Sequence, residues 1–311
     1  DDNNCEEIRK ALDEAIAEEE RPTLIIGKCI MGKGCRNAEN ENYERSCKTH
    51  GAPLGAGAYE NTIKNLGGDL NNPFAIDSEV AEMYKKRLEE LKSIVAKRHT
   101  EEDTWAKNNP NKAEKQKAWF ENKLPEIDWD NIQIKDDDAT RNASSAVLTE
   151  LGDKVGNMIC ASTDLCNSDK TDGYLKKTHN IAKGDFSGKF FQAGVSELTM
   201  ACCCMGMTLH GGVNTAMGTF FVFSDYMKPA IRMAALMELP VKFVWSHDSF
   251  RVGEDGPTHE PIEQEAQIRL MEKIKNFSGK NSVLVMRPAD TKETVRCWKI
   301  AYENNDTPSA L

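Results

Sequence analysis

Two kinds of side chain, carboxylates and imidazoles, lie in loops beside apolar segments of this sequence. Asp164 follows an apolar run, and Glu197 precedes a stretch rich in small and apolar residues. His247 and His259 lie in the loop after a second apolar run. Carboxyl and imidazole groups are common proton donors and acceptors in enzymes, and open α/β sheets bind ligands beyond the carboxyl ends of their strands. These four residues are therefore candidates for proton transfer or for holding a polar ligand.

Each of these residues also has an ordinary structural explanation. Asp164 fits a helix cap, and Glu197 fits a first-turn carboxylate that the helix dipole stabilises. His247 and His259 fit loop histidines whose hydrogen bonds are satisfied locally. Their spacing alone leaves both explanations open.

A series of aromatic residues also has both a functional and a structural explanation. Phe220, Phe223 and Tyr226 recur every three residues, which predicts that their rings share one face of a helix. Without further context, a stripe of core residues explains such a series better than a ligand pocket does.

Two other segments predict neither a phosphate loop nor a metal site. The glycine-containing loop 32–34 has basic neighbours, but it lacks the full spacing of a P-loop. The adjacent cysteines 202–204 lack the paired spacing of a zinc site, and such runs usually pack as small apolar residues. We therefore expect no metal ligands in this chain.

The composition is that of a globular protein with two compact units. Of its 311 residues, 39% are hydrophobic and 29% are charged, and the mean hydropathy is −0.58. There is no apolar run of about 18 residues, so we expect no membrane span.

The net charge of −10 repels a phosphate backbone, so we expect no nucleic-acid partner. Ten cysteines are too few for a disulfide scaffold, which favours reduced thiols and a cytoplasmic location.

The first part of the chain has the elements of an incomplete α/β domain. Helical spacing predicts a helix over residues 4–20, and the continuous apolar run 23–29 predicts a buried strand. No second buried strand precedes the long helix that begins at Ser78, and a lone parallel strand cannot form a sheet. We expect residues 1–70 to be the end of an α/β domain and residues 71–130 to be a helical linker.

Strands and helices alternate in residues 131–311, which predicts a parallel sheet with helices on both faces. The predicted strands are 155–161, 241–245 and 282–286, and the predicted helices begin near residues 140, 197, 261 and 291. The pattern calls for one more buried strand where the sequence ends, so we expect this domain to be truncated.

Several strings of the sequence together resemble transketolase. They are residues 50–55 (HGAPLG), 194–197 (GVSE), 209–212 (LHGG), 219–223 (TFFVF) with Tyr226, 232–237 (RMAALM), 247–249 (HDS) and 253–259 (GEDGPTH). The resemblance extends over nearly the whole chain. It implies a thiamine-diphosphate-binding fold, with residues 1–70 at the end of the diphosphate-binding domain and residues 131–311 as most of the pyrimidine-binding domain.

The resemblance also implies an activity. Transketolases use thiamine diphosphate and a divalent metal, Mg²⁺ or Ca²⁺, to move a two-carbon ketol unit from a ketose phosphate to an aldose phosphate in the pentose phosphate pathway. A carboxylic acid drives the aminopyrimidine of the cofactor to its imino form, and Glu197 is similar to that residue. The family also implies a homodimer with the active site at its interface.

The resemblance assigns further roles residue by residue. Phe220, Phe223 and Tyr226 resemble the aromatic pocket of the pyrimidine, and the cofactor site also includes Asp164 and His50. Sugar phosphate binding falls to Arg141, Ser168 and His247, the C2 hydroxyl to Asp255, and the reacting oxygens to His50 and His259.

The chain departs from the family pattern in one large respect. The metal and the diphosphate are held in transketolases by a Gly-Asp-Gly motif and a later Asn, and no Gly-Asp-Gly occurs in this sequence. We therefore expect these ligands in a missing N-terminal part and expect the 311 residues alone to be inactive. Smaller departures are Asn167 in place of a Pro and Ser196 in place of an Arg.

Two alternatives stay open. One is a related thiamine-diphosphate synthase of the 1-deoxyxylulose-5-phosphate type, against which Glu254 and the His50 string favour transketolase. The other is a non-catalytic split subunit that pairs with a diphosphate-binding partner. The coding sequence on both sides of this segment would distinguish a split subunit from a longer enzyme.

Overall fold

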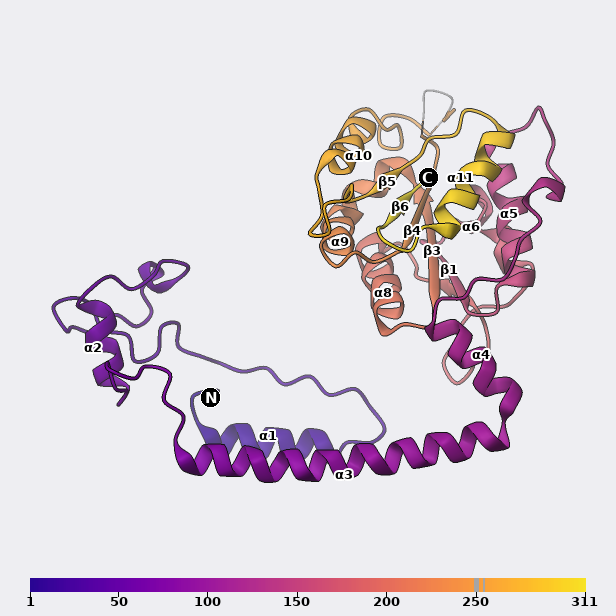
Figure 1. Cartoon of the computed structure of the whole chain (residues 1–311). Helices are drawn as coiled ribbons and strands as arrows, with labels where there is room; N and C mark the ends of the chain where they lie inside the picture. Colours follow the sequence, from indigo (N-terminus) through magenta and orange to yellow (C-terminus); the bar gives the residue numbers. More distant parts are fainter. Residues whose placement is uncertain (249–251, 254) are drawn as a thin grey trace. The chain divides into compact units, whose positions relative to one another are not determined.

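The computed structural model describes residues 1–248, 252–253 and 255–311 (Figure 1). The chain divides into two compact units, Asp1–Glu101 and Glu102–Leu311. The candidate residues of the site, except His50, belong to the second unit. Each unit is described by itself.

The first unit is helical. Its helices are α1 (Cys5–Ala17), η1 (Cys47–Thr49), α2 (Ala58–Asn65) and the start of α3 (Ser78–Asn108). The predicted first helix is confirmed: the Asn4 side chain caps it by accepting hydrogen bonds from the backbone N–H groups of Glu6 and Glu7, at 3.0 and 3.3 Å.

The strand expected at residues 23–29 is wrong for this structure. The segment belongs to no strand, and Leu24 and Ile26 are 84% and 82% exposed. An apolar sequence can form a buried strand only where neighbouring strands complete its hydrogen bonds. Within the described chain, the first unit offers none.

The second unit contains a six-stranded sheet, and every neighbouring pair is parallel, as the alternating pattern predicts. The strand order is β2-β1-β3-β4-β6-β5. The strands are β1 (Met158–Ser162), β2 (Phe190–Gln192), β3 (Asn214–Phe220), β4 (Lys242–Ser246), β5 (Leu284–Val285) and β6 (Ser309–Ala310).

Helices cover both faces of this sheet (Figure 1). One buried cluster joins the sheet to α8 (Glu197–His210), α9 (Ser224–Leu236) and α10 (Gln264–Lys273). The other joins it to α5 (Thr140–Lys154), α7 (Asp172–Leu175) and α11 (Thr291–Glu303). The remaining elements are α4 (Pro110–Phe120), η2 (Trp129–Asn131), α6 (Cys166–Asp169) and η3 (Phe221–Phe223). None of the helices in the described chain is long and apolar enough to cross a membrane.

Strands β2 and β3 are absent from the sequence-based prediction, although β3 lies in the centre of the sheet. All seven residues of β3 are buried, yet several are small or polar. Gly218 shows why small residues are needed, since an added Cβ would lie 2.5 Å from Thr171 and 2.9 Å from Asp169. The final strand expected at the chain end is β6, between β4 and β5.

Candidate active site

The candidate residues gather at one edge of the sheet because three adjacent parallel strands, β1, β3 and β4, end there. Asp164 follows β1, Phe220 closes β3, and His247 follows β4. Since neighbouring parallel strands end at the same edge, their following loops lie side by side. The topology therefore explains why residues far apart in the sequence form one site.

His247 is the centre of this cluster. Its ring stacks on Phe220, with centroids 3.7 Å apart and planes inclined by 25°. Its Nε2 lies 3.0 Å from Nη1 of Arg141, and its Nδ1 lies 2.9 Å from the Ser246 hydroxyl oxygen. A guanidinium can only donate, so Nε2 must accept. In the neutral ring, Nδ1 therefore carries the proton and donates it to Ser246.

The environment keeps the His247 ring neutral. Burial lowers the pKa of His247 below its ordinary value of 6.5, and the charge of Arg141 lowers it further. The carboxylates of Asp255 and Asp248 act in the opposite direction without reversing the shift. A neutral ring near pH 7 is consistent with its acceptor role toward Arg141.

This pKa shift predicts a pH-dependent stability. As pH falls below 6.5, the unfolded chain binds the proton before the folded chain does, so the stability contributed by neutral His247 decreases. His247→Asn removes the titration, and Asn tolerates the positive φ of 56° at this position. We expect the Tm advantage of the wild type over this variant to shrink by about 1–3 °C as pH falls toward 5.

Thermal unfolding of the full-length gene product, measured over this pH range, tests the shift. His210→Asn, at an exposed position on the end of α8, is the matched control. A wild-type advantage over His247→Asn that stays constant with pH would contradict the assignment of a neutral, depressed histidine.

Arg141 links His247 to the loop after β1. Besides His247, its Nη1 contacts the backbone carbonyl oxygen of Ser168 at 3.2 Å. The three residues that the resemblance assigns to the sugar phosphate, Arg141, Ser168 and His247, are thus in contact. Ser168 contributes its carbonyl oxygen to this contact.

A buried carboxylate that the sequence analysis missed supports this loop. Asp169 is 2% exposed and accepts hydrogen bonds from the Ser162 hydroxyl at 2.8 Å and from the backbone N–H and hydroxyl of Thr171 at 2.8 and 2.7 Å. Burial raises the pKa of Asp169 above its ordinary value, and these hydrogen bonds only partly oppose that shift. Asp169 therefore ties the end of β1 to the turn that carries Ser168.

The aromatic residues form a row, but their elements differ from the prediction. Phe220 ends β3, Phe223 lies in η3 and Tyr226 lies in α9, so the single helix face expected for them is wrong. The rings still meet in sequence: Phe220 and Phe223 stack at 5.9 Å, and Phe223 and Tyr226 lie 6.1 Å apart. Tyr226 is 60% exposed. His259 adds an edge contact to Phe223, with centroids 5.3 Å apart.

Glu197 is a buried acid at the start of α8, which packs against β1 and β3. The residue is only 7% exposed, and its carboxylate forms no hydrogen bond or ion pair with another residue of the described ranges. Its carboxylate oxygens are not among the fully buried polar atoms that lack a partner, so they remain accessible to a ligand.

The other predicted residues make fewer contacts with the cluster around His247. Asp164 is exposed, adopts a positive φ of 70° and accepts a hydrogen bond from Gln192 at 3.1 Å. Asp255 is exposed and influences His247 through its charge. His50 is exposed at the end of η1 in the first unit. Glu254, which bears on the choice between enzyme families, lies outside the described residues.

Family models match both parts of the chain. The transketolase pyrimidine binding domain matches residues 137–311, and the transketolase thiamine diphosphate binding domain matches residues 1–125. Two curated transketolases, from Halalkalibacterium halodurans and Bacillus subtilis, are each 39% identical over the whole chain. The chain spans 45% of the length of each of these two relatives.

Solved structures agree with the family models. A transketolase from Leishmania mexicana has a TM-score of 0.86 and 28% identity, covering 100% of this chain and 44% of that one. A transketolase from Pichia stipitis in complex with sedoheptulose 7-phosphate has a TM-score of 0.82 and 31% identity, covering 98% of this chain and 44% of that one. These matches confirm the resemblance drawn from the sequence strings, and the chain belongs to the transketolase family.

Proposed function

We propose that residues 131–311 form the pyrimidine-binding part of a transketolase that transfers a two-carbon ketol unit from a ketose phosphate to an aldose phosphate. The observation that carries this proposal is the Arg141–His247 pair beside a row of aromatic rings, at the edge where β1, β3 and β4 end. This arrangement pairs a cationic contact for a phosphate with apolar faces for a planar ring.

The residues of this edge fit the pyrimidine of thiamine diphosphate. Phe223 and Tyr226 offer ring surface to a planar heterocycle, and Tyr226 is 60% exposed. Glu197 is 7% exposed, and its carboxyl group has no partner in the described chain, which suits a ring that carries nitrogen donors. When bound, thiamine diphosphate supplies the carbon nucleophile of the reaction. Glu197 would exchange a proton with a ring nitrogen of the bound aminopyrimidine, and Asp164 would also belong to the proposed cofactor site.

Arg141 and the neutral His247 beside it are the proposed binding site for a sugar phosphate. Arg141 provides guanidinium N–H groups that bind phosphate oxygens strongly, and His247 lies against Arg141 through its Nε2. Ser168 completes this phosphate site. We assign Asp255 to the C2 hydroxyl of the sugar and His259 to a reacting oxygen.

We further propose that the diphosphate and a Mg²⁺ or Ca²⁺ ion are held by residues outside these 311. The sequence has no Gly-Asp-Gly motif. Among the residues with described positions, no group of three or more His, Cys, Asp or Glu side chains could hold a metal ion.

A two-substrate assay of the full-length gene product tests the proposed function. With thiamine diphosphate and Mg²⁺, we expect xylulose 5-phosphate and ribose 5-phosphate to give sedoheptulose 7-phosphate. Pyruvate with glyceraldehyde 3-phosphate should release no carbon dioxide. Carbon dioxide release without ketol transfer would favour the synthase alternative. The absence of both reactions would refute the proposal.

We also propose a homodimer that buries α8 and completes the active site across its interface. This helix presents Leu198 and Leu209, 45% and 60% exposed, together with exposed Cys202 and Cys203. Small, soft side chains such as these cysteines suit close packing of helices.

We expect Cys203→Glu to shift the full-length gene product from dimer to monomer in sedimentation velocity, because a charge in an apolar interface loses its hydration. Lys154→Glu, at an exposed position on the end of α5, should leave the dimer intact. If both variants remain dimeric at micromolar concentration, α8 is not the interface.

The proposed location is the cytoplasm. All ten cysteines are free thiols in the structure. Five of them are exposed, and an oxidising compartment would favour their oxidation: Cys5, Cys29, Cys47, Cys202 and Cys203.

A further inference from the structure

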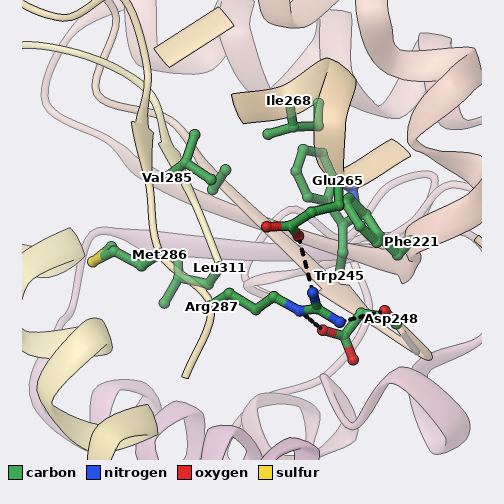
Figure 2. A pocket seen from close by; sticks show the side chains of 10 residues that line it. Phe221, Trp245, Asp248, Glu265, Ile268, Val285, Met286, Arg287 and Leu311 are labelled. Atoms are coloured by element: carbon green, nitrogen blue, oxygen red, sulfur yellow. Dashed lines mark hydrogen bonds and ion pairs between the residues drawn. The ribbon is translucent and has the colours of Figure 1, made fainter. Parts of the chain in front are cut away.

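We propose that Arg287 is a positioning residue that holds Asp248, the residue after His247, so that His247 can bind the sugar phosphate; this inference rests on the proposed function. Arg287 donates through Nε to the Asp248 carboxylate at 2.8 Å and through Nη2 to the Asp248 backbone carbonyl oxygen at 2.9 Å. Its Nη1 lies 3.5 Å from a carboxylate oxygen of Glu265 (Figure 2). One guanidinium thus holds both the side chain and the main chain of the residue after His247.

The contact joins separate elements. Asp248 follows β4, Arg287 follows β5, and Glu265 lies in α10. Since β6 lies between β4 and β5, Arg287 connects the two loops across the end of a third strand. The direction and spacing of its N–H groups permit both Asp248 contacts at once, which the single ammonium of a lysine does not reproduce.

The backbone at His247 explains why such a connection is useful. His247 adopts a left-handed φ of 56°, a conformation that costs energy for a residue with a Cβ. Its ring must also keep three contacts: the stack on Phe220 and the hydrogen bonds with Arg141 and Ser246. Fixing the next carbonyl group limits rotation of the chain at this turn, and therefore fixes the plane of the imidazole.

The charged cluster does not itself form a ligand site. Arg287, Asp248 and Glu265 line a pocket of about 30 Å³, which has room for about one water molecule. The side chains of Arg287 and Asp248 are each 40% exposed. Ion pairs this exposed contribute little to stability. Their geometry is therefore better explained by positioning than by stability.

A double-mutant cycle in the full-length gene product tests the inference. We expect Arg287→Gln to raise KM for the sugar phosphate about tenfold, the loss of roughly one charge-assisted hydrogen bond at the phosphate, with kcat changed less than KM. In a His247→Ala background, Arg287→Gln should raise KM no further, because its effect passes through His247. Arg287→Lys should restore KM only in part.

The matched control is Arg296→Gln, which removes another arginine paired with an aspartate, Asp130, at 2.7 Å on the surface. Its KM should equal that of the wild type. If Arg287→Gln fails to fold, Asp248→Asn serves in the same cycle, since it weakens the side-chain contact and keeps the carbonyl contact.

The outcomes separate this inference from the proposed function. An active wild type whose KM is unchanged by Arg287→Gln would overturn the positioning role alone. The positioning role would also be overturned if Arg287→Gln raised KM equally in the wild type and in the His247→Ala background. A wild type with no ketol transfer would overturn the proposed function instead.

Discussion

Replacing Glu197 with glutamine is expected to lower the turnover of the full-length gene product at least a hundredfold. Glu197 is 7% exposed and has no partner in the described chain, so its carboxyl group is available to exchange a proton with a bound ring. Glutamine has the same shape but cannot exchange that proton, and general acid–base steps contribute roughly 10²–10⁴ in rate. The measurement is kcat for ketol transfer at saturating thiamine diphosphate.

The control for this variant is Glu303→Gln, which removes an exposed carboxylate at the end of α11. It should keep the wild-type turnover. A titration of thiamine diphosphate against Glu197→Gln ensures that low turnover reflects chemistry and not an empty site. If Glu197→Gln keeps half of the activity at saturating cofactor, the proton-exchange role is wrong.

The second large effect concerns the 311-residue chain by itself. We expect no detectable ketol transfer from it, because it has no Gly-Asp-Gly motif to bind the diphosphate and its metal. The full-length gene product, assayed under the same conditions, should be active. Circular dichroism should show that the isolated chain is folded, so that inactivity reflects missing ligands.

Turnover of xylulose 5-phosphate with ribose 5-phosphate by the isolated chain would contradict this expectation. It would mean that other residues in the chain bind the diphosphate. The basic side chains around residues 28–36 would then be the first to test.

The parallel sheet could be predicted because its clearest strands have strong signals. Four of the five residues 241–245 are apolar, the exception being Lys242, as suits a strand buried on both faces, and the segment forms β4 nearly as expected. Strand β3 escaped prediction because tight packing selects small residues there, and Gly218 has no room for a Cβ. A strand that needs small side chains lacks the apolar signal that marks its neighbours.

The first unit contains the opposite case, a segment with a strong strand signal that forms no strand. Residues 23–29 have the composition of a buried strand, but Leu24 and Ile26 are exposed. Local sequence reports a preference for the extended backbone, whereas a strand also requires neighbours that complete its hydrogen bonds.

The site divides along similar lines. Family resemblance identified Arg141 and His247, and the structure brings these two into contact. Asp169 and Arg287 were missed because each is an unremarkable polar residue in the sequence. The role of Arg287 depends on Asp248, 39 positions earlier in the chain, so it becomes visible only after folding.

The most direct test of the proposed site is a crystal structure of the full-length gene product with thiamine diphosphate and a sugar phosphate. The proposal predicts the pyrimidine ring against Phe223 and Tyr226, with a ring nitrogen within hydrogen-bond distance of the Glu197 carboxylate. It also predicts the phosphate beside Arg141 and His247. A pyrimidine bound away from Glu197 and these rings would contradict the proposed function of this edge of the sheet.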